Sequence, residues 1–256
     1  MAAPATGAAG AASNPYGLMA ALEQGGTIAW TVFILLVIMS AASWYIMLTK
    51  LLEQQKIMNQ AKRARTSFWS APNLREGANK LEKNSAYRQL VDDGLIAQDQ
   101  HTKLTDPVDQ HEWMLGSLAR SQAAINSKLS GGLALLATVG STAPFVGLFG
   151  TVIGIYRALI KIGAAGQASI DAVAGPVGEA LIMTALGLAV AVPAVMGYNW
   201  LIRRNKSVAE QLSAFSNDLH GYMMSGGAVK PAALTARGTA PTPPLKTGSA
   251  AINPKA

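Results

Sequence analysis

Three stretches of the chain carry no charged side chain, and they limit its possible folds more than any other feature. They cover residues 24–49, 129–156 and 180–202, which are 26, 28 and 23 residues long. A helix of about 20 apolar residues crosses a hydrocarbon core of roughly 30 Å. Each stretch is long enough to span the membrane. Three separate stretches of this length in a chain of 256 residues argue against buried helices of a soluble protein. The sequence therefore predicts an all-α, polytopic membrane protein with three transmembrane helices.

The distribution of Lys and Arg predicts how these helices are oriented. None precedes residue 24, twelve lie in residues 50–128, two in 157–179 and seven from residue 203 onward. Since basic residues stay on the cytoplasmic side, we expect the N-terminus outside and the C-terminus inside. The net charge of +7 then reflects topology and contact with anionic phospholipids, not nucleic-acid binding. The basic residues assigned to this role are Lys50, Lys62, Arg63, Arg65, Arg203 and Arg204.

Residues 50–128 are predicted to be a cytoplasmic helical region. The first helix should continue to a break at Ser70–Asn73, followed by one or two short helices up to Gln100. Asp106-Pro107 has the pattern of a helix start, with Asp as N-cap and Pro in the first turn. With no breaker recognised beyond it, the second helix is expected to run to about Lys161 as one rod. The third should continue through residues 203–224, so that both extend into a cytoplasmic bundle.

The two ends of the chain are predicted to lack a packed structure. Residues 1–23 lack the basic and apolar regions of a signal peptide and are expected to form a flexible periplasmic arm. Residues 225–256 are rich in Gly, Pro, Ala and Thr and are expected to be disordered.

Nothing in the composition indicates catalysis, a metal or a cofactor. The chain has no Cys, which excludes disulfides and thiolate metal sites. His101, His111 and His220 do not have ligand spacing. The glycines of residues 147–154 lack the Lys-Ser/Thr of a phosphate-binding loop. We therefore expect a protein that is not an enzyme and binds no cofactor or metal.

Small residues recur at spacings of three and four in the second and third apolar stretches. Those of the second are Gly140, Pro144, Gly147, Thr151 and Gly154, with Gly150 adding a GxxxG step, and those of the third are Ala180, Thr184, Gly187, Ala191 and Ala194. In lipid, small residues allow helix backbones to approach closely. Two interpretations stay open: the stripes pack the two helices together, or one edge, with its Thr hydroxyls, also lines a pore.

Glu179 stands at the head of the third stretch and also allows two interpretations. If the helix begins at Pro176, residues 157–175 form an external link, the span covers 176–202 and Glu179 meets the helix dipole in the first turn. If it begins near Ser169–Asp171, Glu179 lies two turns inside. A carboxylate within the bilayer is costly and by default indicates function.

Two segments, GLALLATVGSTAPFVGLFGTVIGIYRAL (132–159) and ASIDAVAGPVGEALIMTALGLAVAVPAVMGYN (168–199), resemble the ExbB/TolQ/MotA proton-channel family. The resemblance implies a bacterial inner-membrane homopentamer around the helices of an ExbD dimer, which acts with TonB in iron-siderophore and cobalamin uptake. It favours the ExbB branch over the TolQ branch, which works with TolR and TolA. A scaffold that passes no protons is the remaining alternative.

The same resemblance assigns roles to individual residues. Glu179, Thr151 and Thr184 match the family's residues along the proton pathway in the pore. Pro144, Gly147 and Gly150 match its positions in the second helix, and Gly154 and Gly187 are expected to pack the pore helices. Helices 2 and 3 would line the pore and helix 1 would lie outside.

Overall fold

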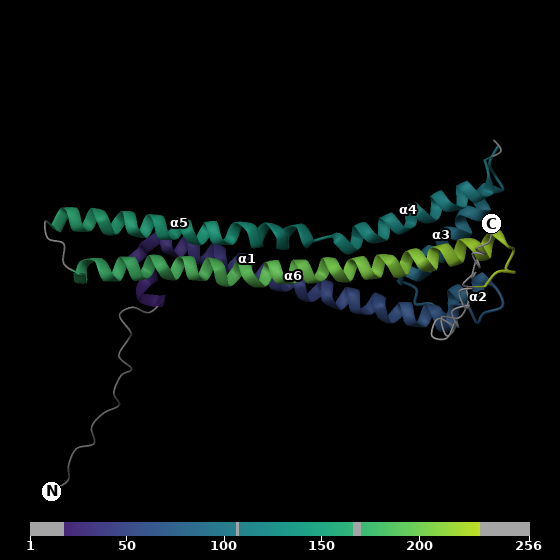
Figure 1. Ribbon diagram of the computed structural model, residues 1–256, viewed down its shortest axis with the longest axis horizontal. Helices are drawn as coiled ribbons and strands as arrows, with labels where there is room; N and C mark the ends of the chain where they lie inside the picture. Colours follow the sequence, from purple (N-terminus) through teal and green to yellow (C-terminus); the bar gives the residue numbers. More distant parts are fainter. Residues whose placement is uncertain (1–17, 106–107, 166–169, 231–256) are drawn as a thin grey trace, which may run out of the picture.

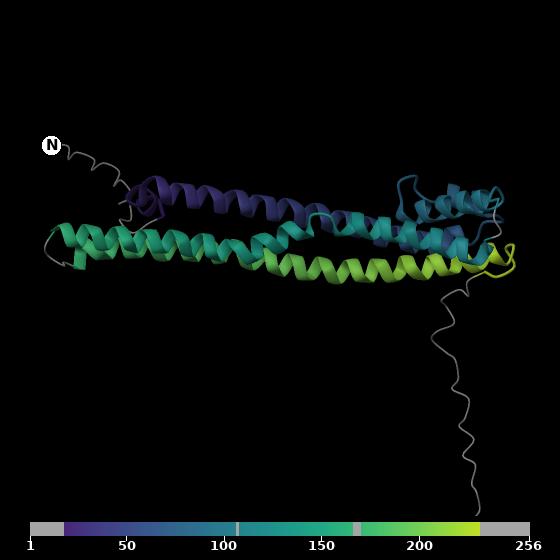
Figure 2. The same cartoon turned by 90° about the horizontal axis from the view of Figure 1, so that it is seen from above.

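Three long helices lie side by side in one half of the molecule, and two of them continue into the other half (Figures 1 and 2). The computed structural model describes residues 18–105, 108–165 and 170–230, and this part of the chain contains no strand. The long helices are α1 (Leu18–Arg63), α5 (Leu133–Ala165) and α6 (Ile170–Met224). Each contains a segment long and apolar enough to cross a membrane. The predicted all-α fold with three spans is confirmed.

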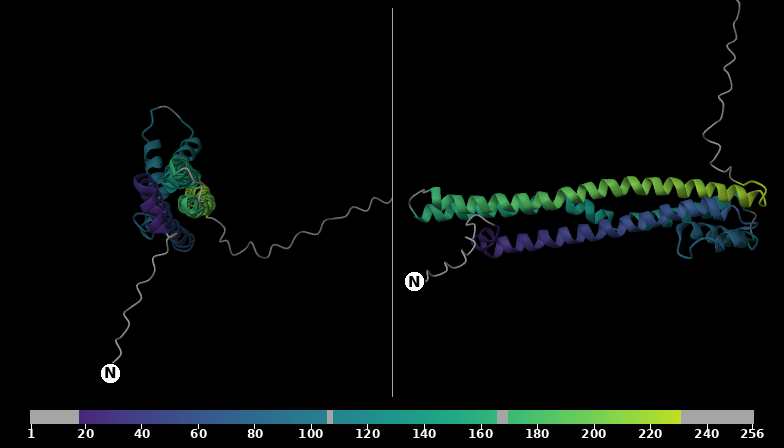
Figure 3. Two further views of the ribbon diagram at one scale, coloured as in Figure 1. Left: turned by 90° about the vertical axis from the view of Figure 1, so that its left-hand side faces the viewer. Right: turned by 90° about the horizontal axis from the view of Figure 1, so that it is seen from below.

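Four shorter helices surround the far ends of α1 and α6 (Figure 3). They are the π-helix η1 (Ala64–Phe68), α2 (Leu74–Asn79), α3 (Ala86–His101) and α4 (Gln110–Ser130). The side chains of Asn73, Ser85 and Asp109 cap α2, α3 and α4 by accepting a backbone N–H, as N-cap residues do. We call these four helices, with the adjoining ends of α1 and α6, the distal bundle.

Two separate apolar clusters hold the fold together. In the distal bundle, the buried residues include Tyr87, Leu90, Met114 and Leu212. The other cluster joins α1, α5 and α6 in the part with the apolar stretches and includes Leu36, Leu136, Ala143, Met183 and Leu201. We call this second part the span region. The large apolar residues exposed on it include Phe145, Phe149, Leu181 and Val192, as expected of helices that face lipid or another subunit.

The expectation of one unbroken second helix is wrong. α4 begins at Gln110 with Asp109 as its N-cap and ends at Ser130, and α5 begins at Leu133. Gly132 between them has φ +82°, a left-handed conformation that glycine adopts without the penalty of a Cβ atom and that commonly ends helices. We call Gly131–Gly132 the joint; it appears as a step between α4 and α5 in Figure 2.

Two of the long helices, α1 and α6, start earlier than their apolar stretches. α1 begins at Leu18 and is kinked at Gly26, which has φ 60° and ψ −151°. The guanidinium of Arg157 donates to the carbonyl of Gly25 beside this kink. α6 begins at Ile170 and so includes Pro176. Most of the predicted arm (1–23) and most of the predicted tail (225–256) lie outside the described residues.

Candidate functional site

The backbones of α5 and α6 come into direct contact where Gly147 faces Gly187. A Cβ atom on Gly147 would lie 2.6 Å from the Met183 carbonyl oxygen and 3.1 Å from the Gly187 Cα. A Cβ atom on Gly187 would lie 2.7 Å from the carbonyl oxygen of Ala143. Real Cβ atoms do not approach backbone this closely, so no side chain fits at either position. The small-residue stripes therefore do pack the two helices together, as in other membrane proteins.

The other predicted packing residues extend this contact in both directions. A Cβ atom on Gly150 would meet Met183 of α6 at 3.1 Å and Val32 of α1 at 3.3 Å, so Gly150 lies where all three helices converge. Gly154 is buried one turn further on, and Pro144 is half-buried inside α5. Because proline has no N–H, it removes one hydrogen bond from the helix ladder. The helix nonetheless continues through Pro144.

Thr151 and Thr184 meet next to this glycine contact. Their hydroxyl oxygens are in hydrogen-bonding contact with each other across the two helices. The Thr151 hydroxyl also lies 3.0 Å from the carbonyl oxygen of Ala180 and 3.2 Å from that of Gly147. Each hydroxyl has one proton to donate and can also accept, so either threonine can be the donor in their mutual contact. The pair is half-buried and forms an uncharged chain of hydroxyl groups between α5 and α6.

The structure decides between the two interpretations of where the helix begins relative to Glu179. α6 starts at Ile170, so Glu179 is in the third turn of the helix and not in the first. Its backbone adjoins Ala180, whose carbonyl lies beside the Thr151 hydroxyl. The Glu179 side chain lies outside the described residues. The backbone thus places the predicted carboxylate position next to the threonine pair along α6.

Comparison with known proteins gives the same family that the sequence resembles. Residues 82–214 match the model of the MotA/TolQ/ExbB proton channel family. The biopolymer transport protein ExbB of Xanthomonas campestris pv. campestris (strain B100) is 43% identical over 213 residues, which cover 79% of this chain and 84% of the relative. The chain belongs to the MotA/TolQ/ExbB proton channel family. The family match includes α3, α4, α5, Glu179 and most of α6.

Relatives from two branches of the MotA/TolQ/ExbB family match this chain. The ExbB of Neisseria gonorrhoeae is 35% identical over 209 residues, covering 79% of this chain and 95% of the relative. The Tol-Pal system protein TolQ of Haemophilus influenzae is 33% identical over 203 residues, covering 73% of this chain and 85% of the relative. An ExbB-type role therefore fits better than a TolQ-type role. Together with its three apolar helices, family membership makes this a multi-pass membrane protein.

The predicted basic residues differ in how free they are to contact lipid. Lys62, Arg65 and Arg203 are exposed. Arg63 pairs with Glu82 at 2.9 Å, and Arg204 lies 5.0 Å from the centre of the Trp200 ring. The Lys50 side chain is only 16% exposed. Its ammonium group donates to Glu53 at 2.7 Å and to the carbonyl of Lys128 at 2.9 Å, so it contacts protein.

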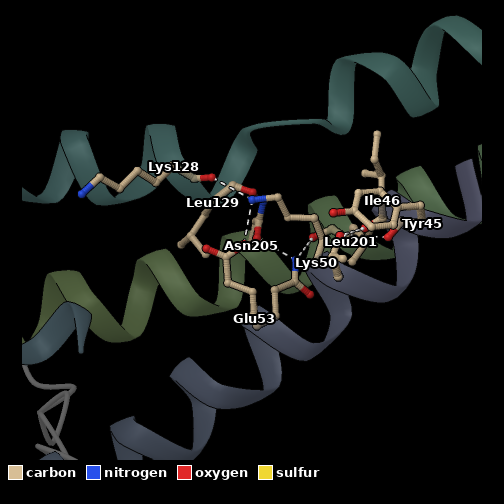
Figure 4. Close-up of polar contacts among 10 residues, drawn as sticks. Tyr45, Ile46, Lys50, Glu53, Lys128, Leu129, Leu201 and Asn205 are labelled. Atoms are coloured by element: carbon tan, nitrogen blue, oxygen red, sulfur yellow. Dashed lines mark hydrogen bonds and ion pairs between the residues drawn. The ribbon is translucent and has the colours of Figure 1, made fainter. Parts of the chain in front are cut away.

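Sequence reasoning missed a polar cluster to which Lys50 belongs (Figure 4). Asn205 of α6 donates to the carbonyl of Leu129 at 3.1 Å. Gln54 of α1 is fully buried and donates to Asn205 Oδ1 at 2.7 Å and to the Leu201 carbonyl at 3.0 Å. An uncharged Gln and Asn just beyond apolar spans were available as a signal. Their contacts could not be predicted from local sequence, because Gln54 lies 147 and 151 residues from its two partners and Asn205 lies 76 residues from Leu129.

Two acidic groups of the distal bundle have a raised pKa. Burial raises the pKa of the Tyr87 phenol to about 12, against the opposing charge of Arg65. Burial also raises the pKa of Asp218, again partly offset by Arg65. Arg65, one of the predicted lipid contacts, therefore also stabilises negative charge in this bundle.

Proposed function

We propose that this chain is the pore-forming subunit of a proton-driven motor in the bacterial inner membrane. Five copies would surround the helices of an ExbD dimer. With TonB, the complex would energise outer-membrane receptors that import iron-siderophores and cobalamin. The observation that carries the proposal is the α5–α6 contact, where two threonine hydroxyls and the Glu179 position lie together in a chain of this family. No enzymatic step and no cofactor is part of the proposal.

The orientation proposed is N-terminus in the periplasm and C-terminus in the cytoplasm. The distal bundle then lies in the cytoplasm, with most of the Lys and Arg residues, in accord with the positive-inside rule. The exposed Arg203 directly follows the third apolar stretch and would contact anionic phospholipids. Lys62 and Arg65 lie about 20 Å or more along the chain beyond the first apolar stretch, and Arg65 lies near Tyr87 and Asp218 of the distal bundle, so these two are left out of that role. Lys50 is left out of that role because its ammonium group contacts Glu53 and Lys128.

Protons would enter from the periplasm and reach an acidic group on the ExbD helix. The Glu179 carboxylate and the hydroxyls of Thr151 and Thr184 would organise water and charge along this path. A hydroxyl both donates and accepts a hydrogen bond, so the threonine pair can reorient as the charge nearby changes without carrying charge itself. Protonation would then free the ExbD helix to move relative to the ring.

The proposal is tested by complementation in a bacterial strain that lacks its own ExbB-type and TolQ-type proteins. The chain is expressed with its cognate ExbD and TonB, and growth on an iron-siderophore as sole iron source is compared with resistance to detergent. Siderophore-dependent growth without restored detergent resistance is expected. In a second strain, the chain is expressed with its cognate TolR and TolA. Detergent resistance restored there, without siderophore-dependent growth in the first strain, would support the TolQ-type role instead. Assembly with ExbD and TonB but no growth would support a scaffold that passes no protons.

A further inference from the structure

The end of α4 is held by side chains from two other helices. α4 and α5 are joined only through Gly131–Gly132, where the regular helical ladder stops. The last carbonyls of a helix lack partners within it and need others. Here the carbonyl of Lys128 accepts from the Gly131 N–H at 3.2 Å and also from Lys50 of α1, and that of Leu129 accepts from Asn205 of α6. α1 and α6 both continue unbroken past this level (Figure 4).

Gln54 links α1 to α6, the two helices whose side chains hold the end of α4. From α1 it donates to the Leu201 carbonyl and to the Asn205 side chain of α6. The Asn205 amide is thereby oriented, with its oxygen toward Gln54 and its nitrogen toward Leu129. We call Lys50, Gln54 and Asn205 the clasp. It ties α1, α4 and α6 together at the joint.

The clasp is a costly way to obtain stability alone. The Gln54 side chain is fully buried, yet its Oε1 has no partner among the described residues. A buried polar atom without a partner lowers stability because it has lost its hydrogen bonds to water. Apolar residues of similar volume would pack here without that cost. The polar clasp therefore specifies where the end of α4 sits, which apolar packing would do less precisely.

We propose that the joint is a hinge and that Lys50 and Asn205 are positioning residues that hold it at one angle. With the clasp formed, the end of α4 is fixed relative to α5. Without it, α4 pivots about Gly131–Gly132. α5 also carries Thr151 and α6 carries Thr184, so the joint sets the angle between α4 and a helix of the threonine contact. This inference concerns the geometry of the chain and holds independently of the proposed transport function.

Distances between spin labels across the joint test the proposal in the full-length chain. The chain has no Cys, so Gly116→Cys in α4 and Ser141→Cys in α5 label it cleanly at exposed positions on either side of the joint. The labelled chain is diluted into unlabelled chain in lipid nanodiscs, so that only distances within one subunit are measured. Four variants are compared: Lys50→Met, Asn205→Leu, Lys50→Arg and, as a control on α6, the exposed Lys206→Met.

The proposal predicts a broader distance distribution with a shifted maximum for Lys50→Met and Asn205→Leu. Lys50→Arg keeps a donor for the Lys128 carbonyl and should restore the parent distribution, and Lys206→Met should not change it. An unchanged distribution in both clasp variants overturns the proposal. A second label pair at Gln98 in α3 and Asn217 in α6, both exposed, reports whether the distal bundle keeps its fold. If this distance is also lost in both clasp variants, the clasp is required for folding, and the hinge is rejected.

Discussion

The hydroxyl groups of Thr151 and Thr184 are hydrogen-bonded to each other across the α5–α6 contact. Each also lies within the stretch of helix that Gly147 and Gly187 bring together. The close backbone approach and the hydroxyl pair are one structural unit, because the threonines meet only when the glycines allow the helices to touch. Removing a hydroxyl is expected to impair function with the helices still packed, whereas adding a Cβ atom to a glycine is expected to separate the helices and lower stability.

Replacing Thr151 by Val removes the hydroxyl and keeps the shape. We expect loss of siderophore-dependent growth with the complex still assembled, because Thr184 loses its partner and the hydroxyl chain is broken. The cost in stability should be about 1 kcal/mol, as for one hydrogen bond. Thr151→Ser keeps the hydroxyl and should keep activity. Thr142→Val is the matched control, since the exposed Thr142 hydroxyl bonds only within α5, to the Thr138 carbonyl. Equal growth of Thr151→Val and Thr142→Val would contradict this role.

Replacing Gly147 by Ala should separate α5 from α6. The added Cβ would lie 2.6 Å from the Met183 carbonyl, and relieving such overpacking costs about 1–3 kcal/mol. Thermal unfolding in detergent, followed by circular dichroism, should show a lower midpoint. Gly163→Ala is the control, because a Cβ there meets nothing within 4 Å. If both variants unfold at the same temperature, the close contact is not important for stability.

The three spans were predictable because charge is absent from long stretches, a signal that needs no knowledge of tertiary contacts. The sequence also contains a signal for the break after Ser130, the pair Gly131–Gly132. This signal is weak, because glycines recur throughout the next helix without ending it. What ends α4 is the φ of +82° at Gly132 and the donors from Lys50 and Asn205. These partners come from helices remote in sequence, which no local pattern reveals.

The candidate site was partly predictable for the same reason. Stripes at spacings of three and four place Thr151 and Thr184 on the packed faces of their helices, but they do not give the register between the helices. The structure supplies that register by setting Gly147 against Gly187. For Glu179, the sequence left two helix starts open, and α6 begins at the earlier one, Ile170.

Replacing Gly132 by Ala should destabilise the joint. A left-handed conformation costs a residue with a Cβ about 1–2 kcal/mol, and here the Cβ would also lie 3.3 Å from the Ile46 side chain. Gly116→Ala should have the opposite sign, since it is inside α4 with nothing within 4 Å of a Cβ, and Ala gains up to about 1 kcal/mol over Gly in a helix. Denaturant unfolding of the full-length chain measures both. A stability change of the same sign in both variants would contradict the conclusion that Gly132 needs a left-handed conformation.

The distal bundle should lose stability at alkaline pH because of Tyr87. Its pKa is about 12 in the folded protein against 10.0 for the free side chain. The unfolded chain therefore loses this proton first, and the stability contributed below pH 10 falls as pH rises from about 10 to 12. A shift of about two pKa units corresponds to roughly 3 kcal/mol.

Tyr87→Phe isolates this effect, because the Phe ring still packs against Phe215, whose ring centre is 5.1 Å away. The variant should match the parent at pH 7 and lose less stability between pH 10 and 12, measured by the near-ultraviolet circular dichroism of the full-length chain during denaturant unfolding. The same alkaline loss in both proteins would show that Tyr87 is not its source.

The most direct test of the proposed function is siderophore-dependent growth of the complemented strain with Glu179→Gln, with recovery of the ExbD and TonB complex checked in parallel. Glu210→Gln, at an exposed position of α6, controls for the loss of one carboxylate. We predict that Glu179→Gln assembles but does not support growth, whereas Glu210→Gln grows like the parent. Growth of Glu179→Gln equal to the parent would contradict the assignment of Glu179 to the proton path.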